Sequence, residues 1–194
     1  MRYKGINHLA LATGDMNQTI CFWRDLIGLR LVAGLGKPGY RQYFFELGPY
    51  NMLLFFEWSQ VQPLPEKDHG VPVQGPFGFD HLALEVETLD DLWTLYDKLS
   101  AADFWVSEIL DHGFIYSMYA FDPNNIPIEF TWSVPDFNLR ENPCMLDTQP
   151  DQEALNGPEP EPGKWPQVTE PTLQEDRQIY PGEGQEFRNK RNKW

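Results

Sequence analysis

Asn7-His8-Leu9-Ala10-Leu11 recurs 73 residues later as Asp80-His81-Leu82-Ala83-Leu84. Self-similarity at a fixed period is typical of a duplicated structural unit. The segments after the two copies also match, since apolar residues recur at helical spacing over Asp15–Leu31 and again over Thr88–Leu99. Both ranges begin with a residue type that caps helix N-termini. The repeat therefore predicts two copies of a strand followed by a helix.

Short alternating runs rich in aromatic residues come after each predicted helix, and turn residues such as Asp122-Pro123-Asn124-Asn125 separate them. Such runs are typical of half-buried strands. The order β-α-β-β-β is thus predicted twice, which indicates an α+β fold. The predicted strands after the helices are Leu29–Leu35, Arg41–Leu47 and Asn51–Trp58, then Trp105–Leu110, Phe114–Phe121 and Ile126–Trp132.

Four parts are expected along the chain: a first module at residues 1–58, a linker rich in Pro and Gly at 59–76, a second module at 77–132, and a C-terminal region at 133–194. The last region holds 9 of the 17 prolines, has a net charge of −5 and shows no sustained period. This composition predicts either an extended arm or a disordered tail. Its apolar residues are candidate anchors to the body or to a partner subunit: Trp165, Ile179, Tyr180, Phe187 and Trp194.

The charge of the chain narrows the class of partner. Its 194 residues include 29 acidic and 15 basic ones, a net charge of −14. A surface this negative repels phosphate backbones and anionic lipids, so we expect neither nucleic acid nor membrane as a partner.

No apolar run approaches the roughly 20 residues of a membrane span. The N-terminus leads into a strand-like segment without a signal-peptide apolar region. Cys21 and Cys144 are too few for a disulfide scaffold, so we expect a cytoplasmic protein.

The two repeated histidines are candidate ligands. Side chains alternate between the faces of a strand, so His8 shares its face with Ala10, and His81 shares its face with Ala83. The opposite, leucine-bearing faces should pack under the helices, while the alanines leave room for a ligand. The alternative is a pair of histidines hydrogen-bonded in a core. Matching positions in the repeat favour a site.

Glu129 is the third candidate ligand. It lies in the predicted strand Ile126–Trp132 between apolar neighbours, and no Lys or Arg is close in sequence. A buried carboxylate costs several kcal/mol unless it is paired with a cation or metal. Two histidines and one carboxylate form the facial triad that suits Fe(II) with open coordination positions. The alternative is a glutamate at the rim that reaches water.

Paired β-α-β-β-β modules that each begin with His-Leu-Ala-Leu resemble the vicinal oxygen chelate superfamily. It includes glyoxalase I, type I extradiol ring-cleaving dioxygenases, fosfomycin-resistance thiol transferases, epimerases and bleomycin-binding proteins. The resemblance covers roughly residues 4–132. It implies two modules that form a cupped, incomplete barrel around a divalent metal held by His8, His81 and Glu129.

The stretch from His112 to Glu129 resembles the signature of the extradiol dioxygenases: a histidine, an apolar-Tyr pair, an acidic-Pro turn and the glutamate ligand. It departs from that signature at Asn125, where the family usually has Gly or Pro, and at Leu110, where a smaller or β-branched residue is usual. Asn tolerates the left-handed turn conformation, so the first departure is physically mild. The resemblance implies that Tyr119 hydrogen-bonds a substrate hydroxyl and that His112 lines the pocket.

His69 lies 12 residues before His81, near the place of the family's acid/base histidine. An imidazole that titrates near neutral pH suits a proton shuttle. The alternative for His69 is a solvated loop histidine, and the alternative for Tyr119 is a core aromatic.

Glyoxalase I and its relatives place a fourth ligand on the last strand of the first module. Here that position is predicted near Leu53, and Glu57 lies about 13 Å further along a strand of about 3.3 Å per residue. Three ligands and an apolar wall favour oxygen chemistry. Fosfomycin-type transferases need cationic side chains to hold a phosphonate, and Ser117–Phe121 offers none.

The implied function is an Fe(II)-dependent extradiol-type ring-cleaving dioxygenase that acts on a small catechol-like aromatic with O₂. Mn, Zn and Ni are the alternative metals. Two other functions stay open: a metal-dependent glyoxalase-like lyase or isomerase with Glu57 or water as fourth ligand, and a non-catalytic small-molecule binding module. Superfamily members often dimerise, so we expect a homodimer, with the C-terminal arm a candidate contact to the partner.

Overall fold

The computed structural model describes residues 5–37, 39–65, 72, 79–150, 152–160, 163, 165–182 and 185–189. Two compact units divide the chain, Met1–Leu139 and Arg140–Trp194. The first unit carries both copies of the repeat and extends past residue 132, the predicted end of the second module.

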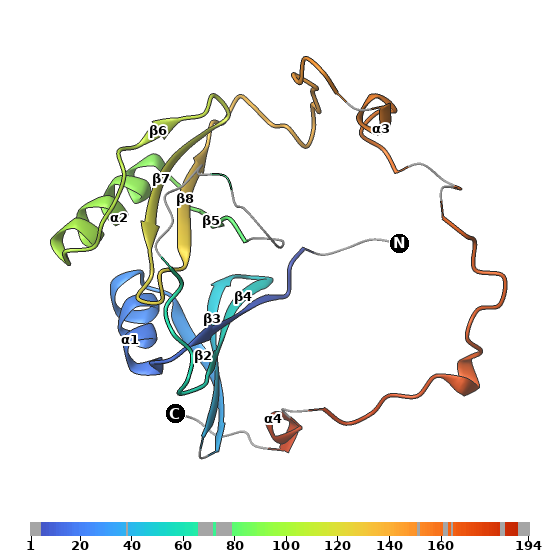
Figure 1. Ribbon diagram of the computed structural model, residues 1–194, viewed down its shortest axis with the longest axis horizontal. Coiled ribbons are helices and arrows are strands. Elements are labelled where there is room, and N and C mark those ends of the chain that lie inside the picture. The colour runs from blue at the N-terminus through green and yellow to red at the C-terminus, as the bar shows by residue number, and fades with distance from the viewer. Residues whose placement is uncertain are drawn as a thin grey trace. The chain divides into compact units, whose positions relative to one another are not determined.

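The first module contains one mixed four-stranded sheet (Figure 1). The strand order is β1-β4-β3-β2, with β1 parallel to β4 and the other neighbours antiparallel. Its elements are β1 (His8–Thr13), α1 (Met16–Ile20), η1 (Cys21–Leu26), β2 (Arg30–Lys37), β3 (Tyr40–Gly48) and β4 (Asn51–Glu57).

The second module repeats this topology with the order β5-β8-β7-β6, in which β5 is parallel to β8. The predicted α+β fold of two β-α-β-β-β modules is therefore confirmed. Within the described residues neither sheet closes into a barrel. The elements are β5 (Leu82–Glu85), α2 (Leu89–Ala101), β6 (Leu110–Asp111), β7 (Ile115–Phe121) and β8 (Pro127–Ser133).

The helix starts are those that the sequence predicts. The carboxylate of Asp15 accepts a hydrogen bond of 3.0 Å from the backbone N–H of Gln18. Thr88 and Asp91 form a capping box, in which each side chain accepts from the other residue's backbone N–H. These bonds satisfy N–H groups that the first turn of a helix leaves without a partner.

One predicted strand is wrong, and the first predicted helix differs in its helix type. The predicted strand Trp105–Leu110 pairs with β7 only through an isolated bridge at Val106 and through β6, whose first residue is Leu110. The helical spacing that begins at Asp15 corresponds to α1 followed by the π-helix η1, and the helical stretch stops before Gly28, whose φ of 97° is typical of a glycine at a helix end. A π-turn holds one more residue than an α-turn, and spacing alone does not distinguish the two over so short a stretch.

The hydrophobic core lies on the leucine-bearing faces of both sheets, as predicted. Leu9 and Leu11 pack against it from β1, while β5 contributes Leu84 to it and packs Leu82 against it. The largest fully buried side chains include Trp23, Phe22, Phe45, Phe55, Phe130, Met16, Leu53, Leu92, Leu99, Met118 and Ile128.

The second unit has little regular structure where it is described. It contains α3 (Gln152–Leu155), η2 (Gln174–Asp176) and α4 (Glu186–Asn189). Four of the five candidate anchors are exposed, namely Trp165, Ile179, Tyr180 and Phe187, and Trp194 lies outside the described residues. Among the helices that the structure describes, none has the length and apolar character needed to cross a membrane.

Candidate functional site

The strand register of the second module places the candidate residues on one face. Ala83 on β5 is opposite Glu129 on β8, and Glu129 is opposite Tyr119 on β7. His81 immediately precedes β5 and has the same parity as Ala83. This face is opposite to the one that carries the leucines of the core.

Glu129 is the centre of a hydrogen-bonded group on that face. Its side chain is 7% exposed, and the Tyr119 hydroxyl donates a bond of 3.0 Å to Oε1. His81 Nε2 lies 2.9 Å from Oε2. His112 Nε2 lies 3.4 Å from the Tyr119 hydroxyl. Glu129 is therefore not a rim glutamate in water, because its carboxylate is buried and paired.

Both repeated histidines are oriented by the residue that precedes them. His81 Nδ1 lies 2.6 Å from a carboxylate oxygen of Asp80, and His8 Nδ1 lies 2.8 Å from the amide oxygen of Asn7. These oxygens only accept, so Nδ1 carries the proton and Nε2 of a neutral ring is left as an acceptor. Metal-ligating histidines are held in the same way.

His81 Nε2 thus faces an oxygen of Glu129, and two acceptors at this distance need a proton or a cation between them. A neutral imidazole nitrogen and a carboxylate oxygen are both ligands of divalent transition metals. His81 Nε2 and Glu129 Oε2 can therefore share a proton or serve as two ligands of one metal on the face of the second sheet that carries Glu129, which we call the site face.

His8 is the predicted ligand that the structure does not unite with the others. It is exposed at the start of β1, with its ring centroid 6.4 Å from that of Phe44. Among the described residues, no three His, Cys, Asp or Glu side chains are grouped closely enough to hold a metal. His81 and Glu129 are brought together, and the full triad stays a prediction.

Tyr119 is held protonated by its surroundings. Burial raises the pKa of its hydroxyl to about 12, and the hydrogen bond to Glu129 and the charges of Glu129 and Asp80 act in the same direction. At neutral pH it is therefore a hydrogen-bond donor beside the buried carboxylate. The hydroxyl is hydrogen-bonded to Glu129 on the site face, and the choice between a substrate-binding tyrosine and a core aromatic stays a prediction.

The two other candidate histidines differ in what is known of them. His112 is exposed just after β6, and its backbone N–H donates to the carbonyl of Ile115 at 2.9 Å, which anchors the hairpin that presents it. Gly113, with a φ of 85°, makes the turn. His69 lies outside the described residues, so its role stays a prediction.

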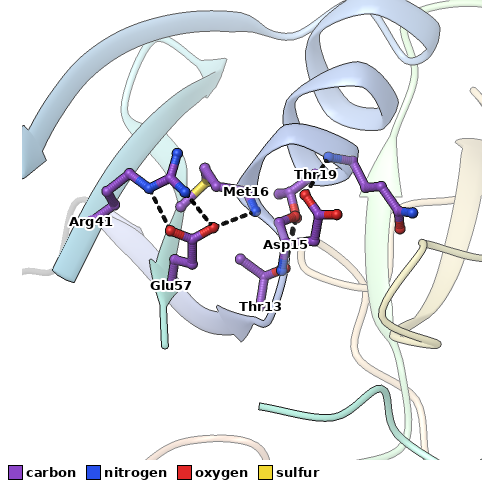
Figure 2. Close-up of polar contacts among 7 residues, drawn as sticks. Thr13, Asp15, Met16, Thr19, Arg41 and Glu57 are labelled. Atoms are coloured by element: carbon purple, nitrogen blue, oxygen red, sulfur yellow. Dashed lines mark hydrogen bonds and ion pairs between the residues drawn. The ribbon is translucent and has the colours of Figure 1, made fainter. Parts of the chain in front are cut away.

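Glu57 is bound elsewhere (Figure 2). Its Oε1 accepts from Arg41 Nη2 and from the backbone N–H of Met16, each at 2.8 Å, and Arg41 Nε donates to Oε2. The carboxylate is thus occupied by a guanidinium and by the first turn of α1. This arrangement does not support Glu57 as a fourth ligand.

The predicted position of a fourth ligand, Leu53, needs correction. Leu53 is fully buried in the core, on the face opposite to His8. The register gives the true counterpart of Glu129: Ala83 pairs with Glu129, and its repeat equivalent Ala10 pairs with Leu54. The counterpart is apolar, so the first module offers no carboxylate there.

Sequence reasoning missed the residues that orient the histidines. Asn7 and Asp80 stand in front of the two histidines in both copies of the repeat. A hydrogen-bonding side chain at the same offset in each copy was the signal that could have identified them.

Comparisons with known proteins identify the family of the chain. The sequence profile described as Glyoxalase/Bleomycin resistance protein/Dioxygenase superfamily matches residues 5–130. An iron-dependent extradiol dioxygenase from Rhodococcus jostii (strain RHA1) is 27% identical over 142 residues, which cover 66% of this chain and 42% of that protein. A biphenyl-2,3-diol 1,2-dioxygenase from Paraburkholderia xenovorans (strain LB400) is 25% identical over 137 residues, covering 67% and 41%.

The chain spans about two fifths of the length of these curated relatives. A solved structure shares the fold: the glyoxylase/bleomycin resistance protein/dioxygenase domain from Frankia sp. EAN1pec. It superposes with a TM-score of 0.57 at 18% identity and covers 69% of this chain and 100% of that one.

Proposed function

The chain belongs to the Glyoxalase/Bleomycin resistance protein/Dioxygenase superfamily, and we propose that it is an extradiol-type ring-cleaving dioxygenase. It would use Fe(II) and O₂ on a small catechol-like aromatic. The observation that carries the proposal is the buried carboxylate of Glu129 between the Tyr119 hydroxyl and His81 Nε2. The likeness to two dioxygenases supports the choice of branch.

His8, His81 and Glu129 would hold the metal. When bound, Fe(II) supplies Lewis acidity and open positions for the vicinal oxygens of the substrate and for O₂. Asp80 and Asn7 keep Nε2 of the two histidines available as acceptors. Glu129 supplies a negative charge that the low-dielectric site makes more effective.

Tyr119 and His112 would orient the substrate. The Tyr119 hydroxyl donates to Glu129 and lies close to His112 Nε2, so it is already directed toward the ligand side of the sheet. A substrate hydroxyl placed between them would exchange hydrogen bonds with both. His69 would shuttle a proton between the substrate and oxygen.

The absence of a fourth carboxylate at the matching position of the described first module argues against the lyase or isomerase. That chemistry moves a proton at carbon and needs a base. The counterpart of Glu129 is Leu54, and Glu57 is bound by Arg41 and the N–H of Met16.

The test is elemental analysis of the full chain purified without oxygen, together with O₂ uptake on a panel of catechols. Near-stoichiometric iron and O₂ consumption are expected. Glu129→Gln should abolish both, while Glu57→Gln, which changes a carboxylate remote from the site face, should bind as much metal as the wild type. Bound zinc, nickel or manganese without O₂ uptake would replace the proposal with the lyase or isomerase. No bound metal would leave a binding module.

We also propose that the protein acts as a cytoplasmic homodimer, with the C-terminal region in contact with the partner. The two exposed free cysteines agree with a reducing compartment. Light scattering on the full chain should give the mass of a dimer, and a chain ending after residue 139 should give the mass of its own monomer.

A further inference from the structure

The turn between β7 and β8 is joined to the other module by two buried hydrogen bonds. Trp23 Nε1 donates to Asp122 Oδ2 at 3.2 Å, and Thr13 Oγ1 donates to Asn124 Oδ1 at 2.8 Å. All four residues are almost fully buried. We call these two contacts the module joint.

Asp122 also shapes the turn itself. Its Oδ1 accepts from the backbone N–H groups of Asn124 and Ile126, at 2.8 and 2.9 Å. Its Oδ2 accepts from the side-chain amide of Asn124 at 3.1 Å, besides the indole of Trp23. Asn125 takes a φ of 57°, the left-handed conformation that closes the turn. One carboxylate therefore fixes the turn and links it to the first module.

The first module is built to present the indole and the hydroxyl. Trp23 lies in the π-helix η1 and is fully buried. Thr13 Oγ1 accepts a 2.9 Å hydrogen bond from the Thr19 hydroxyl (Figure 2) and a 3.0 Å one from the backbone N–H of Asp15, which leaves its own proton for Asn124.

Within the described residues, the second copy of the repeat has no equivalent of the joint. The repeat equivalents of Thr13 and Trp23 are Val86 and Tyr96, and the register equivalent of Asp122 is Leu47. With leucine in place of the carboxylate, this second set cannot reproduce the indole–carboxylate bond. The polar joint therefore belongs to the module that carries the buried carboxylate.

The turn connects the strands that carry the site. Tyr119 lies three residues before Asp122 on β7, and Glu129 comes after the turn on β8. We propose that Asp122, held by Trp23, is a positioning residue that sets where Glu129 and Tyr119 lie relative to the first module, and hence relative to His8. The inference rests on the proposed function in that a metal joins His8 to His81 and Glu129.

The experiment measures the affinity of the full chain for Co²⁺ by its visible absorption, which needs no turnover. Trp23→Phe keeps a ring in the core and removes one hydrogen-bond donor. We expect it to weaken Co²⁺ binding by ~10-fold, the size of effect seen when an outer-shell partner of a metal site is lost. Thr88→Ala, which removes the cap of α2 without touching the joint, is the control of similar structural cost and should leave the affinity unchanged.

Wild-type affinity in Trp23→Phe, or an equal loss in Thr88→Ala, would overturn the positioning role. If Trp23→Phe does not fold, Asp122→Asn is the second variant, and it should show the same selective loss against the same control. Failure of the wild type to bind Co²⁺ would instead refute the proposed metal site. The two failures are therefore distinguishable.

Discussion

Replacing Glu129 by leucine should raise the stability of the metal-free protein while abolishing its ability to hold a metal. Leucine is the residue at the register counterpart, Leu54. The Glu129 side chain is 7% exposed, so folding removes a charge from water. A group retained at such a cost is expected where function requires it.

The magnitude depends on the partners of the carboxylate. Exchanging a buried ion pair for apolar residues often stabilises a protein by ~1–4 kcal/mol, whereas removing one partner is harmful when the other is left buried and charged. His81 is 32% exposed and keeps its bond to Asp80, and Tyr119 keeps its contact with His112. Neither is left without a polar partner, so we expect a gain at the low end, about 1 kcal/mol.

The assay is urea unfolding of the metal-free full chain, with Co²⁺ binding measured alongside. A gain of this size corresponds to a rise of roughly 3 °C in the Tm of the first compact unit, Met1–Leu139. The reverse change, Leu54→Glu, is the matched control and should destabilise by about 3 kcal/mol or more, because it buries a charge without a partner. If Glu129→Leu lowers the free energy of unfolding by about 2 kcal/mol, the carboxylate is a structural group and the reasoning fails.

Three further outcomes are expected. Ser117 Oγ is buried without a hydrogen-bond partner in the described residues, so Ser117→Ala should raise the free energy of unfolding by about 0.5–1 kcal/mol, and a loss in urea unfolding would contradict this. Burial raises the pKa of Asp122 above 3.8, against its hydrogen bonds, so the folded state binds the proton more tightly. The protonated carboxyl of Asp122 therefore contributes its full stabilisation below pH 3.8, the ordinary pKa, and this stabilisation is lost as the pH rises through the higher pKa of the folded state. The unfolding free energy of the wild type minus that of Asp122→Asn should therefore fall from pH 3.8 upward, and a rise would refute it. Glu57→Gln should lower stability by about 1–2 kcal/mol because it weakens the bonds to Arg41 and the N–H of Met16, and unchanged thermal unfolding would show that those bonds contribute nothing.

The modules could be predicted from sequence because their signals are local. Each copy of the five-residue motif, each capping residue and each helical or alternating period can be recognised within a few consecutive residues. The strand Trp105–Leu110 failed for the same reason: its alternation is locally correct, but its pairing with β7 depends on a partner at a distance in the chain.

The fourth-ligand position shows how register limits such reasoning. Leu53 and Leu54 are neighbours, yet they lie on opposite faces of β4, since a shift of one residue exchanges the faces of a strand. Only the pairing of Ala10 with Leu54 decides between them. The module joint could not be predicted from the sequence for a further reason. Its two hydrogen bonds join residues that are 99 and 111 positions apart, and no local pattern distinguishes either partner within its own segment.

Comparing the two modules shows which features of the candidate site occur in both and which occur in one. Each copy has a histidine with an acceptor on Nδ1. At two matching positions the copies differ: the second has Glu129 where the first has Leu54, and Tyr119 where the first has Phe44. On the face that carries His8, the first module therefore presents apolar side chains at the matching positions. With one carboxylate in the second module and none at the matching position of the first, the proposed site has no second base of this kind. This asymmetry is the structural reason to test ring-cleaving oxygen chemistry before isomerisation.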